Sequence, residues 1–385
     1  MFIQPVDLDD RRQVRQFLEL PAALYRAIPQ YVPPLESDAR AWLDYRRNPF
    51  YRHSQAGFWL AMDGGRPIGR LAALDNRRYN DFNHERTAFF YLFECEDHRA
   101  AALGLFAAAA DWARGRGLDK LLGPKGFTPL DGLGLLVQGF EHRPAFGLPY
   151  NPAYYVDLVE AAGFETDGEL VSGYLDARTF RLPERVHQVA RLVQERRGLR
   201  VLRFQSRNDL RAVLPKLKQL YNGALGGTSG NVPLTDAEVE AIAGQLLWFA
   251  DPRLIKIIVK GDEPVGFLFA YPDVSAALQR TRGRLFPFGW LTLLWELRQT
   301  RWLNVNGAGV VEQYRGLGGT ALLFSELEHS LREGGRFDHA DLVQIGVEND
   351  RMQRELRDLG IDFYKRHRLY RQRLAPAGSG AAPTP

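Results

Sequence analysis

The chain has little cysteine and no long hydrophobic run, and each absence excludes a class of protein. Cys95 is the only cysteine among 385 residues, so an internal disulfide is excluded and a reducing compartment is favoured. No segment supplies the roughly 18 to 20 consecutive apolar residues that a membrane-spanning helix needs. The first residues also lack the basic and then apolar order of a secretory signal. We therefore expect a cytoplasmic protein without a transmembrane segment.

The chain also lacks a large excess of either charge. The 50 basic and 46 acidic residues leave a net charge of +4, which is spread along the chain. Because no basic patch stands out, no specific nucleic acid is expected as a partner. The remaining composition is globular, with 45% hydrophobic, 12% aromatic and 25% charged residues. The length exceeds what one hydrophobic core usually serves, so two domains are the starting expectation.

An internal repeat supports this division. The apolar strand pair around Pro67 recurs around Pro264, and a helix that closes on Gly163 recurs before Gly360. The two offsets, 264 minus 67 and 360 minus 163, are both 197. Two matches at one spacing, with the same order of elements between them, indicate a duplicated unit.

Each half of the chain alternates strands and helices in the same order, which predicts an α/β fold with a mixed (α+β) sheet in two tandem domains. We place the first domain at residues 1–180 and the second at 181–374. Residues 375–385 are mostly small or proline and are expected to form a disordered tail.

The strongest chemical signal lies where the long strand of the second domain ends and a helix begins. From Val310 to Thr320 the chain reads Val-Val-Glu-Gln-Tyr-Arg-Gly-Leu-Gly-Gly-Thr, with three glycines in four positions. A helix start has unpaired amides and the positive end of the helix dipole, and small residues there let a phosphate approach. Arg315 and Thr320 could add hydrogen bonds to the same group. The alternative is a tight strand-to-helix turn without a ligand.

This loop and the segment from Asn349 to Gly360 resemble the GNAT acyltransferase superfamily, whose members bind acyl-coenzyme A. The resemblance covers Leu199 to Arg373, and the glycine loop is its only specific motif. It implies two tandem GNAT-like acyl-CoA N-acyltransferase domains, with acyl-CoA (acetyl-CoA by default) as cosubstrate and no metal. It also implies that the strand ending near Glu312 diverges from the strand 340–347, with the pantetheine between them. The implied coenzyme-binding residues are Gly309, Val310, Val311, Gln313, Arg315, Gly316, Gly318, Gly319, Thr320 and Asn349.

The sequence departs from the GNAT pattern at the residue that often acts as the catalytic acid. Four residues before Gly360, where the superfamily often has a tyrosine, the chain has Leu356. Tyr364 is the candidate substitute, although a tyrosine on a terminal strand is often a packing residue. Glu312 and Glu348 are the candidate bases, although a solvated carboxylate at a strand end is the plainer interpretation.

The first domain lacks the glycine loop. Alignment of the two halves sets Ala100 and Ala102 against Gly316 and Gly318, and a β-carbon at each alanine would crowd the amides that a pyrophosphate must reach. We expect a degenerate copy without coenzyme, which is structural or shapes the acceptor site. Its irregular run 123–155 is rich in glycine, proline and aromatic residues, which suit a substrate pocket or the seam between domains. This run resembles bacterial tandem GNAT-like proteins of undefined substrate.

An aromatic insertion distinguishes the second domain. Leu285 to Leu297 contains two tryptophans and several leucines, with arginines on both sides. The run is too short to span a bilayer. It suits a helix packed between domains, a peripheral membrane contact or a lid over a long acyl chain, or a dimer interface. The oligomeric state is left open.

These observations together predict an acyl-CoA-dependent N-acyltransferase that transfers an acetyl group by default, or a longer acyl group, to a small-molecule or lipid-like amine. Transfer would consist mainly of holding the amine and the thioester carbonyl in attack geometry, while backbone hydrogen bonds stabilise the oxyanion. The rival interpretations are a non-catalytic acyl-CoA-binding module, and a long-chain acyltransferase that acts on a lipid-like amine at a membrane surface.

Overall fold

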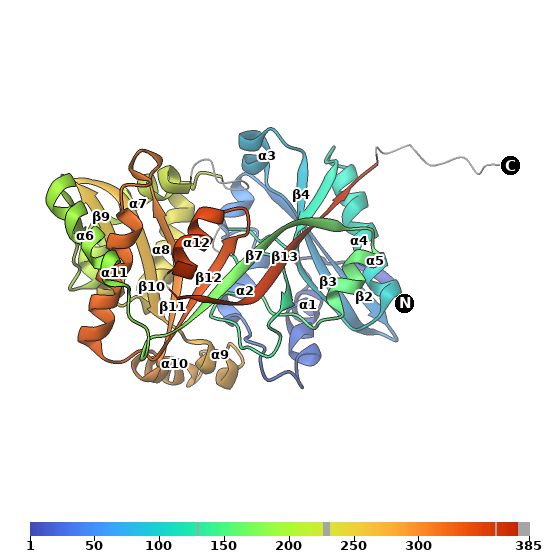
Figure 1. Cartoon of the computed structure of the whole chain (residues 1–385). Coiled ribbons are helices and arrows are strands. Elements are labelled where there is room, and N and C mark those ends of the chain that lie inside the picture. The colour runs from blue at the N-terminus through green and yellow to red at the C-terminus, as the bar shows by residue number, and fades with distance from the viewer. Residues whose placement is uncertain (129–130, 226–231, 359, 376–385) are drawn as a thin grey trace. The chain divides into compact units, whose positions relative to one another are not determined.

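The computed structural model describes residues 1–128, 131–225, 232–358 and 360–375 (Figure 1). The chain divides into two compact units. Unit 1 consists of Met1–Val171, Leu278–Pro287 and the residues from Lys365 onward, and unit 2 consists of Ser172–Ala277 and Phe288–Tyr364. Apart from Ala375, the expected disordered tail lies outside the described residues.

Unit 1 is built around one sheet. Its strands are β1 (Phe2–Pro5), β2 (Gln55–Asp63), β3 (Arg66–Asp75), β4 (Thr87–Cys95), β5 (Lys120–Gly123), β6 (Leu135–Gln138), the first part of β7 (Glu165–Asp176) and the second part of β13 (Asp362–Arg373). Its helices are α1 (Arg11–Leu24), α2 (Glu36–Leu43), α3 (Arg77–Asn83), α4 (Arg99–Arg114) and α5 (Tyr155–Ala161), with a 3₁₀ turn at Pro49–Arg52. The strand order is β1-β2-β3-β4-β5-β13, and β4 pairs with β5 in parallel.

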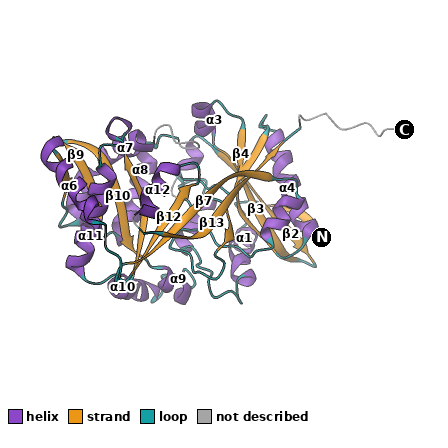
Figure 2. Cartoon of the chain, in the orientation of Figure 1, coloured by secondary structure: helices purple, strands orange, loops and turns teal. Residues whose placement is uncertain are grey.

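Helices cover both faces of this sheet (Figure 2). Helix α4 packs on one face because its buried side chains recur every three or four positions. These side chains are Ala101, Ala102, Leu105, Phe106, Ala109, Ala110 and Ala113. Alternation along β4 directs Phe90 to the core under α4 and Phe89 to the core that includes Phe17 of α1. Unit 1 therefore has one hydrophobic core on each face of its sheet.

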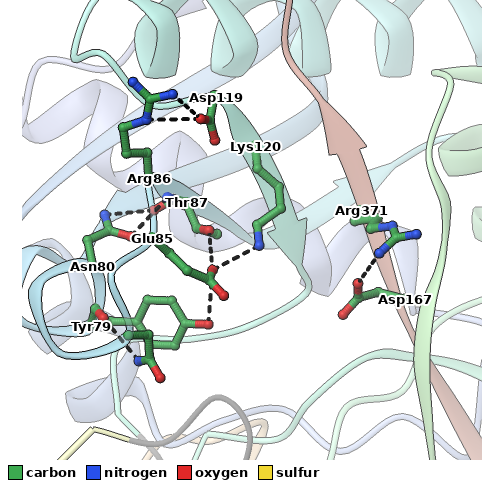
Figure 3. A network of polar contacts seen from close by, with 10 residues as sticks. Tyr79, Asn80, Glu85, Arg86, Thr87, Asp119, Lys120, Asp167 and Arg371 are labelled. Carbon is green, nitrogen blue, oxygen red and sulfur yellow. Dashed lines mark hydrogen bonds and ion pairs between the residues drawn. The ribbon is translucent and has the colours of Figure 1, made fainter.

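A polar network holds the beginning of β4 (Figure 3). Asn80 of α3 donates a hydrogen bond to the carbonyl of Thr87 at 3.0 Å and accepts one from the Thr87 amide at 2.9 Å. The Glu85 carboxylate accepts hydrogen bonds from Lys120 at 2.8 Å and from the Thr87 hydroxyl at 2.7 Å. Burial alone would raise the pKa of Glu85, but these two donors outweigh it and lower the pKa. The network links α3, β4 and β5, and so determines where β4 begins.

Unit 2 repeats this plan. Its strands are the second part of β7, β8 (Leu199–Leu202), β9 (Ile255–Lys260), β10 (Glu263–Pro272), β11 (Trp302–Val310), β12 (His339–Gly346) and the first residues of β13. Its helices are α6 (Glu184–Arg197), α7 (Arg207–Leu225), α8 (Asp236–Phe249), α10 (Gly289–Gln299), α11 (Gly319–Gly334) and α12 (Asp350–Asp358), with 3₁₀ turns at Pro252–Leu254 and Glu312–Tyr314. Helix α9 (Ser275–Thr281) crosses the boundary between the units. The strand order is β7-β12-β11-β10-β9-β8, and β11 pairs with β12 in parallel.

The faces of the second sheet are covered by different helices. Helices α6 and α11 share a core with Leu268 of β10, whereas α7 shares a core with Phe267, the residue before it. The strand alternation thus separates an α11 side from an α7 side. The helix after the glycine loop packs through an apolar stripe, since Leu322, Leu323 and Leu327 of α11 are buried.

The two sequence repeats correspond to the two sheets except in their last strands. The second hairpin strands, β3 and β10, begin 197 residues apart, at 66 and 263. From Ser172, β7 belongs to unit 2 beside β12, and from Lys365, β13 belongs to unit 1 beside β5. The units therefore do not coincide with the ranges 1–180 and 181–374. The final strand of each repeat begins in its own unit and ends in the other. This division depends on tertiary pairing, which leaves no local sequence pattern.

The aromatic insertion forms the two short helices α9 and α10 with an irregular segment between them. In α10, Leu293 is buried, whereas two tryptophans and two leucines of the same helix are exposed. Within the described part of the chain, no helix combines the length and the apolar character needed to cross a bilayer.

Candidate active site

The parallel strands β11 and β12 separate part of the way along their length. Their pairing ends at Val305 and Leu342, although both strands continue. A β-bulge lies at this point, because Phe269 of β10 faces two residues of β11, Asn306 and Gly307. Gly307 has a φ of +103°, a conformation that residues with a β-carbon rarely adopt. The divergence implied by the GNAT resemblance is therefore present, and the bulge accounts for it locally.

The loop after β11 leads into α11 through residues with accessible amides. Gly316 and Gly318 have φ values of +79° and +89°, and Gly318 stands immediately before the first helical residue, Gly319. Within the described residues, the amides of Gly318, Gly319, Thr320 and Ala321 donate to no backbone carbonyl. No side chain caps α11, and its first turn contains no acidic residue. Free amides at the positive end of a helix fit the diphosphate of coenzyme A.

Gly318 also has a structural reason to be glycine. A β-carbon at this position would lie 2.6 Å from Cγ2 of Val193 and 2.8 Å from Cγ1 of Val189, both on α6. The positive φ adds backbone strain for any other residue. A bulky residue at Gly318 would therefore displace α6 as well as obstruct the loop. For this reason, substitution of Gly318 does not separate coenzyme binding from folding.

The corresponding helix start in unit 1 is closed by one of its own side chains. His98 stands before α4, and its Nδ1 accepts a hydrogen bond from the Ala101 amide at 3.1 Å. Ala100 and Ala102 lie within α4, so their alignment with the loop glycines is wrong. The residue that corresponds to Gly318 is His98. The physical reason to expect no diphosphate in unit 1 is thus this capped helix start rather than crowding by alanine.

Several of the predicted coenzyme-binding residues have partners within the protein, including Arg315, whose Nε donates to the Val310 carbonyl at 3.1 Å. The Val311 amide donates to the Val265 carbonyl at 2.9 Å, so it is occupied by the neighbouring strand. The Asn349 side chain accepts a hydrogen bond from the Met352 amide at 3.1 Å and thereby caps α12. Gly309 lies on the part of β11 that has separated from β12. Of Val311, Asn349 and Gly309, the last is the one best placed to face a pantetheine.

The candidate bases and the candidate acid lie at different levels of the sheet. Glu312 and Glu348 are exposed just beyond the ends of β11 and β12. Tyr364 lies at the start of β13, and its phenol donates a 2.9 Å hydrogen bond to Oδ2 of Asp341. Asp341 faces Asn304 in the paired part of β11 and β12. At roughly 3.3 Å per residue, the end of β12 is about 16 Å from Asp341, so Tyr364 is not brought together with either glutamate.

The position that often carries the catalytic tyrosine in the superfamily is part of the core here. Leu356 of α12 is 1% exposed and packs in the cluster that contains Ile361 and Leu323. A buried hydroxyl requires a hydrogen-bond partner, which a leucine does not. Tyr364, which bonds to Asp341 in the paired part of the strands, remains the candidate acid.

Buried polar residues at this point escape detection from the sequence. Asn304 and Asp341 face each other and are 0% and 2% exposed. Nearby, the Asn306 side chain donates to the hydroxyl of Tyr271 at 2.8 Å. The only sequence signal for these residues is the alternation of asparagine with apolar residues in β11. Such alternation normally indicates that one side of a strand faces solvent. Here that side is the buried α7 side.

Unit 1 contains a partly buried carboxylate, Glu94, which was also missed from the sequence. Glu94 accepts hydrogen bonds from Tyr25 at 2.6 Å and Tyr155 at 2.8 Å, and Arg70 lies 3.7 Å away. Burial raises the pKa of Glu94, and the opposing effect of Arg70 and the two phenols does not cancel it. Tyr155 and Phe127, from the aromatic run 123–155, both belong to the cores of unit 1.

Comparison with known proteins gives relatives from the sequence and a shared fold from the structure. No family model matches the chain. Protein YghO from Escherichia coli is 25% identical over 370 residues, which cover 95% of this chain and 94% of that protein. The bacterial ceramide synthase from Caulobacter vibrioides is 30% identical over 290 residues, which cover 74% of each chain. A tandem GNAT protein from the clavulanic acid biosynthesis pathway matches 97% of this chain and 99% of its own, with a TM-score of 0.57 and 15% identity.

The chain belongs to the same family as the bacterial ceramide synthase, and its fold is that of a tandem GNAT protein. The tandem GNAT fold and the ceramide synthase relative support an N-acyltransferase, and the fold implies acyl-CoA as its cosubstrate. The separated strands β11 and β12 and the uncapped start of α11 are the features of unit 2 that fit this cosubstrate.

Proposed function

We propose that this GNAT protein transfers a long acyl chain from coenzyme A to the amine of a lipid-like acceptor at a membrane surface. The observation that carries the proposal is the exposed apolar face of α10. Trp290 and Trp295 are 40% and 55% exposed, whereas Glu296 is 7% exposed. A helix that turns tryptophan outward and a carboxylate inward is matched to an apolar environment outside the protein.

The residues beside α10 favour a lipid surface as that environment. Phe288, Leu291 and Leu294 extend the exposed apolar face. Arg298 of the same helix is exposed, and further arginines precede the helix in sequence. Tryptophan and leucine accompanied by arginine are the composition of helices that lie in the headgroup region of an anionic bilayer. The arginines also weigh against a simple apolar contact between protein copies.

The name of the 30% identical relative favours a long acyl chain over an acetyl group. That relative is named a ceramide synthase, and a ceramide is the amide of a fatty acid with a long-chain amino alcohol. The name supports a fatty acyl donor and a lipid-like amine for this chain too. The exposed face of α10 supports the same class of acceptor independently.

The buried polar residues at the strand separation supply the proton transfers that amide formation requires. The reaction forms a C–N bond, breaks the thioester C–S bond and moves one proton net from nitrogen to sulfur. Asp341 would accept the proton that the amine nitrogen loses. Tyr364 would donate its proton to the leaving sulfur and regain one from Asp341 across their 2.9 Å hydrogen bond. The free amides at the start of α11 would hold the diphosphate.

The test is a product assay by mass spectrometry with the full-length protein. Palmitoyl-CoA and acetyl-CoA are each offered with a sphingoid base in anionic vesicles and, separately, with a small water-soluble amine. We expect amide from palmitoyl-CoA and the sphingoid base, at a rate that increases when vesicles are present. Amide formed only from acetyl-CoA and the soluble amine would contradict the proposal, and thiol release without any amide would indicate hydrolysis. Asp341→Asn, which keeps the size of the side chain, serves as the inactive control.

A further inference from the structure

A cavity of about 310 Å³ lies within unit 2 on the α11 side of the sheet. Leu303 and Val305 of β11 and Ala340 and Leu342 of β12 line it from the sheet, and Leu327 lines it from α11. Ligand pockets usually measure about 300–1,000 Å³, so this volume can hold part of a ligand. Val305 and Leu342 are also the last paired residues of the two strands. The cavity therefore adjoins the point where β11 and β12 separate.

Strand alternation gives the two sides of this point opposite chemistry. Val305 and Leu342 face the cavity, whereas their preceding neighbours Asn304 and Asp341 belong to the other side of the sheet. That other side is polar and buried, and it includes the phenol of Tyr364 bonded to Asp341. On the α11 side, the residues that β11 and β12 contribute to the cavity are all apolar, whereas other parts of the cavity wall include charged side chains. A thioester held between the strands thus has an apolar space on one side and a carboxylate on the other.

The one buried carboxylate in the cavity wall is engaged by its own neighbours. Glu328 accepts hydrogen bonds from the Leu182 amide at 3.3 Å and from Arg332 at 2.6 Å, and His187 lies 3.0 Å from its second oxygen. With these partners, the carboxylate does not need water from the cavity. The wall that β11 and β12 form is thus suited to an apolar occupant, although Arg178, Arg181, Arg332 and Asp338 also line the cavity.

We propose that this cavity holds the alkyl chain of the acyl donor, while the Asn304–Asp341 side receives the amine. The inference rests on the proposed function and adds to it the place where the alkyl chain of the donor binds. An alkyl chain on the polar side would lie against the buried polar groups of Asn304 and Asp341, which an apolar group cannot hydrogen-bond. The same chain in the cavity gains transfer free energy with every buried methylene. The two sides of the sheet thereby keep the donor chain and the acceptor apart.

The first experiment measures binding of acetyl-CoA, octanoyl-CoA and palmitoyl-CoA to the full chain by calorimetry. Ala340→Leu places added side-chain volume in the cavity. It should weaken binding of palmitoyl-CoA by about tenfold, the effect of roughly two methylenes that lose their burial, and leave acetyl-CoA binding unchanged. The control is Ala270→Leu, which adds the same volume to the same core away from the cavity lining. This variant should show the same preference for acyl-chain length as the unmodified protein.

A second measurement does not depend on these variants folding. Palmitoyl-CoA with a photoreactive diazirine near the end of its chain is bound to the unmodified protein, irradiated, and the labelled peptides are identified. We expect label in the second half of α11 and in β12, around Leu327 and Ala340. Label on α7 or α10 instead, or equal loss of acetyl-CoA and palmitoyl-CoA binding in Ala340→Leu, overturns the inference but not the proposed function. Absence of binding of any acyl-CoA to the unmodified chain overturns both.

Discussion

The phenol of Tyr364 donates a 2.9 Å hydrogen bond to the carboxylate of Asp341, which is 2% exposed on β12. Burial, together with the negative charge of Asp341, raises the pKa of Tyr364 far above its usual value. The phenol is therefore protonated throughout the physiological range. A protonated phenol beside a buried carboxylate can donate one proton and recover another locally, and this makes the pair the acid and base of the proposed transfer.

Tyr364→Phe tests this pair. We expect kcat to fall by about 10²-fold, because general acid catalysis contributes roughly 10²–10⁴-fold, while the Kd for acyl-CoA stays unchanged. Tyr370→Phe is the matched control, since it removes the hydroxyl of another buried phenol of β13, which bonds to Glu160 in unit 1. An unchanged kcat in a folded Tyr364→Phe protein would exclude the phenol as the acid.

The diphosphate site can be tested with Thr320→Asp without damage to the helix. An acidic residue in the first turn favours α11 through the helix dipole but repels a diphosphate at the same amides. We expect an equal or higher Tm and the loss of coenzyme A binding. Ala100→Asp, which is exposed in the first turn of α4, is the matched control and should bind coenzyme A normally. Calorimetry should give one site per chain, and retained affinity in Thr320→Asp would show that the diphosphate binds elsewhere.

The double variant Trp290→Ser, Trp295→Ser tests the membrane contact. Both side chains are substantially exposed, so we expect Tm to change little, while binding to anionic vesicles in a flotation assay becomes much weaker. Phe82→Ser, which removes a 52% exposed aromatic residue from α3, should leave vesicle binding unaffected. A large fall in Tm with unchanged vesicle binding would mean that the tryptophans pack against protein rather than lipid.

His367 of β13 gives unit 1 a pH-dependent stability. Burial lowers its pKa to about 4, although the Pro149 carbonyl acts in the opposite direction. The unfolded chain binds this proton near pH 6.5, so its contribution to stability is complete above about pH 6.5 and is lost as the pH falls toward 4. We expect a loss of about 3 kcal/mol across this window.

Chemical denaturation at several pH values between 7 and 4 checks this expectation. His367→Gln should remove the part of the pH dependence of the unfolding free energy that comes from His367, whatever the substitution does to the stability at pH 7. His142→Gln, whose side chain is 42% exposed, should retain the slope. If His367→Gln and the unmodified chain lose stability in parallel, another group is responsible.

Local patterns accounted for features that depend on neighbours in sequence. The glycines from Gly316 to Gly319 place the start of α11 correctly, and the leucines of α11 predict its buried face. The same local reasoning failed at Ala100 and Ala102, because the cap that His98 forms on α4 depends on where that helix begins. It also passed over Asp341, because a single aspartate in a strand looks the same whether that side of the sheet faces water or another layer.

The amino-acid sequence by itself determined the duplicated α/β plan, the glycine loop and the apolar insertion, because each is encoded in the spacing of residues along the chain. Only the tertiary structure decided that β7 and β13 exchange between the two units, that Tyr364 meets Asp341, and that a cavity adjoins Val305 and Leu342. These features join segments far apart in the chain, and their energies come from pairing and burial between such segments. No property of either segment alone specifies them.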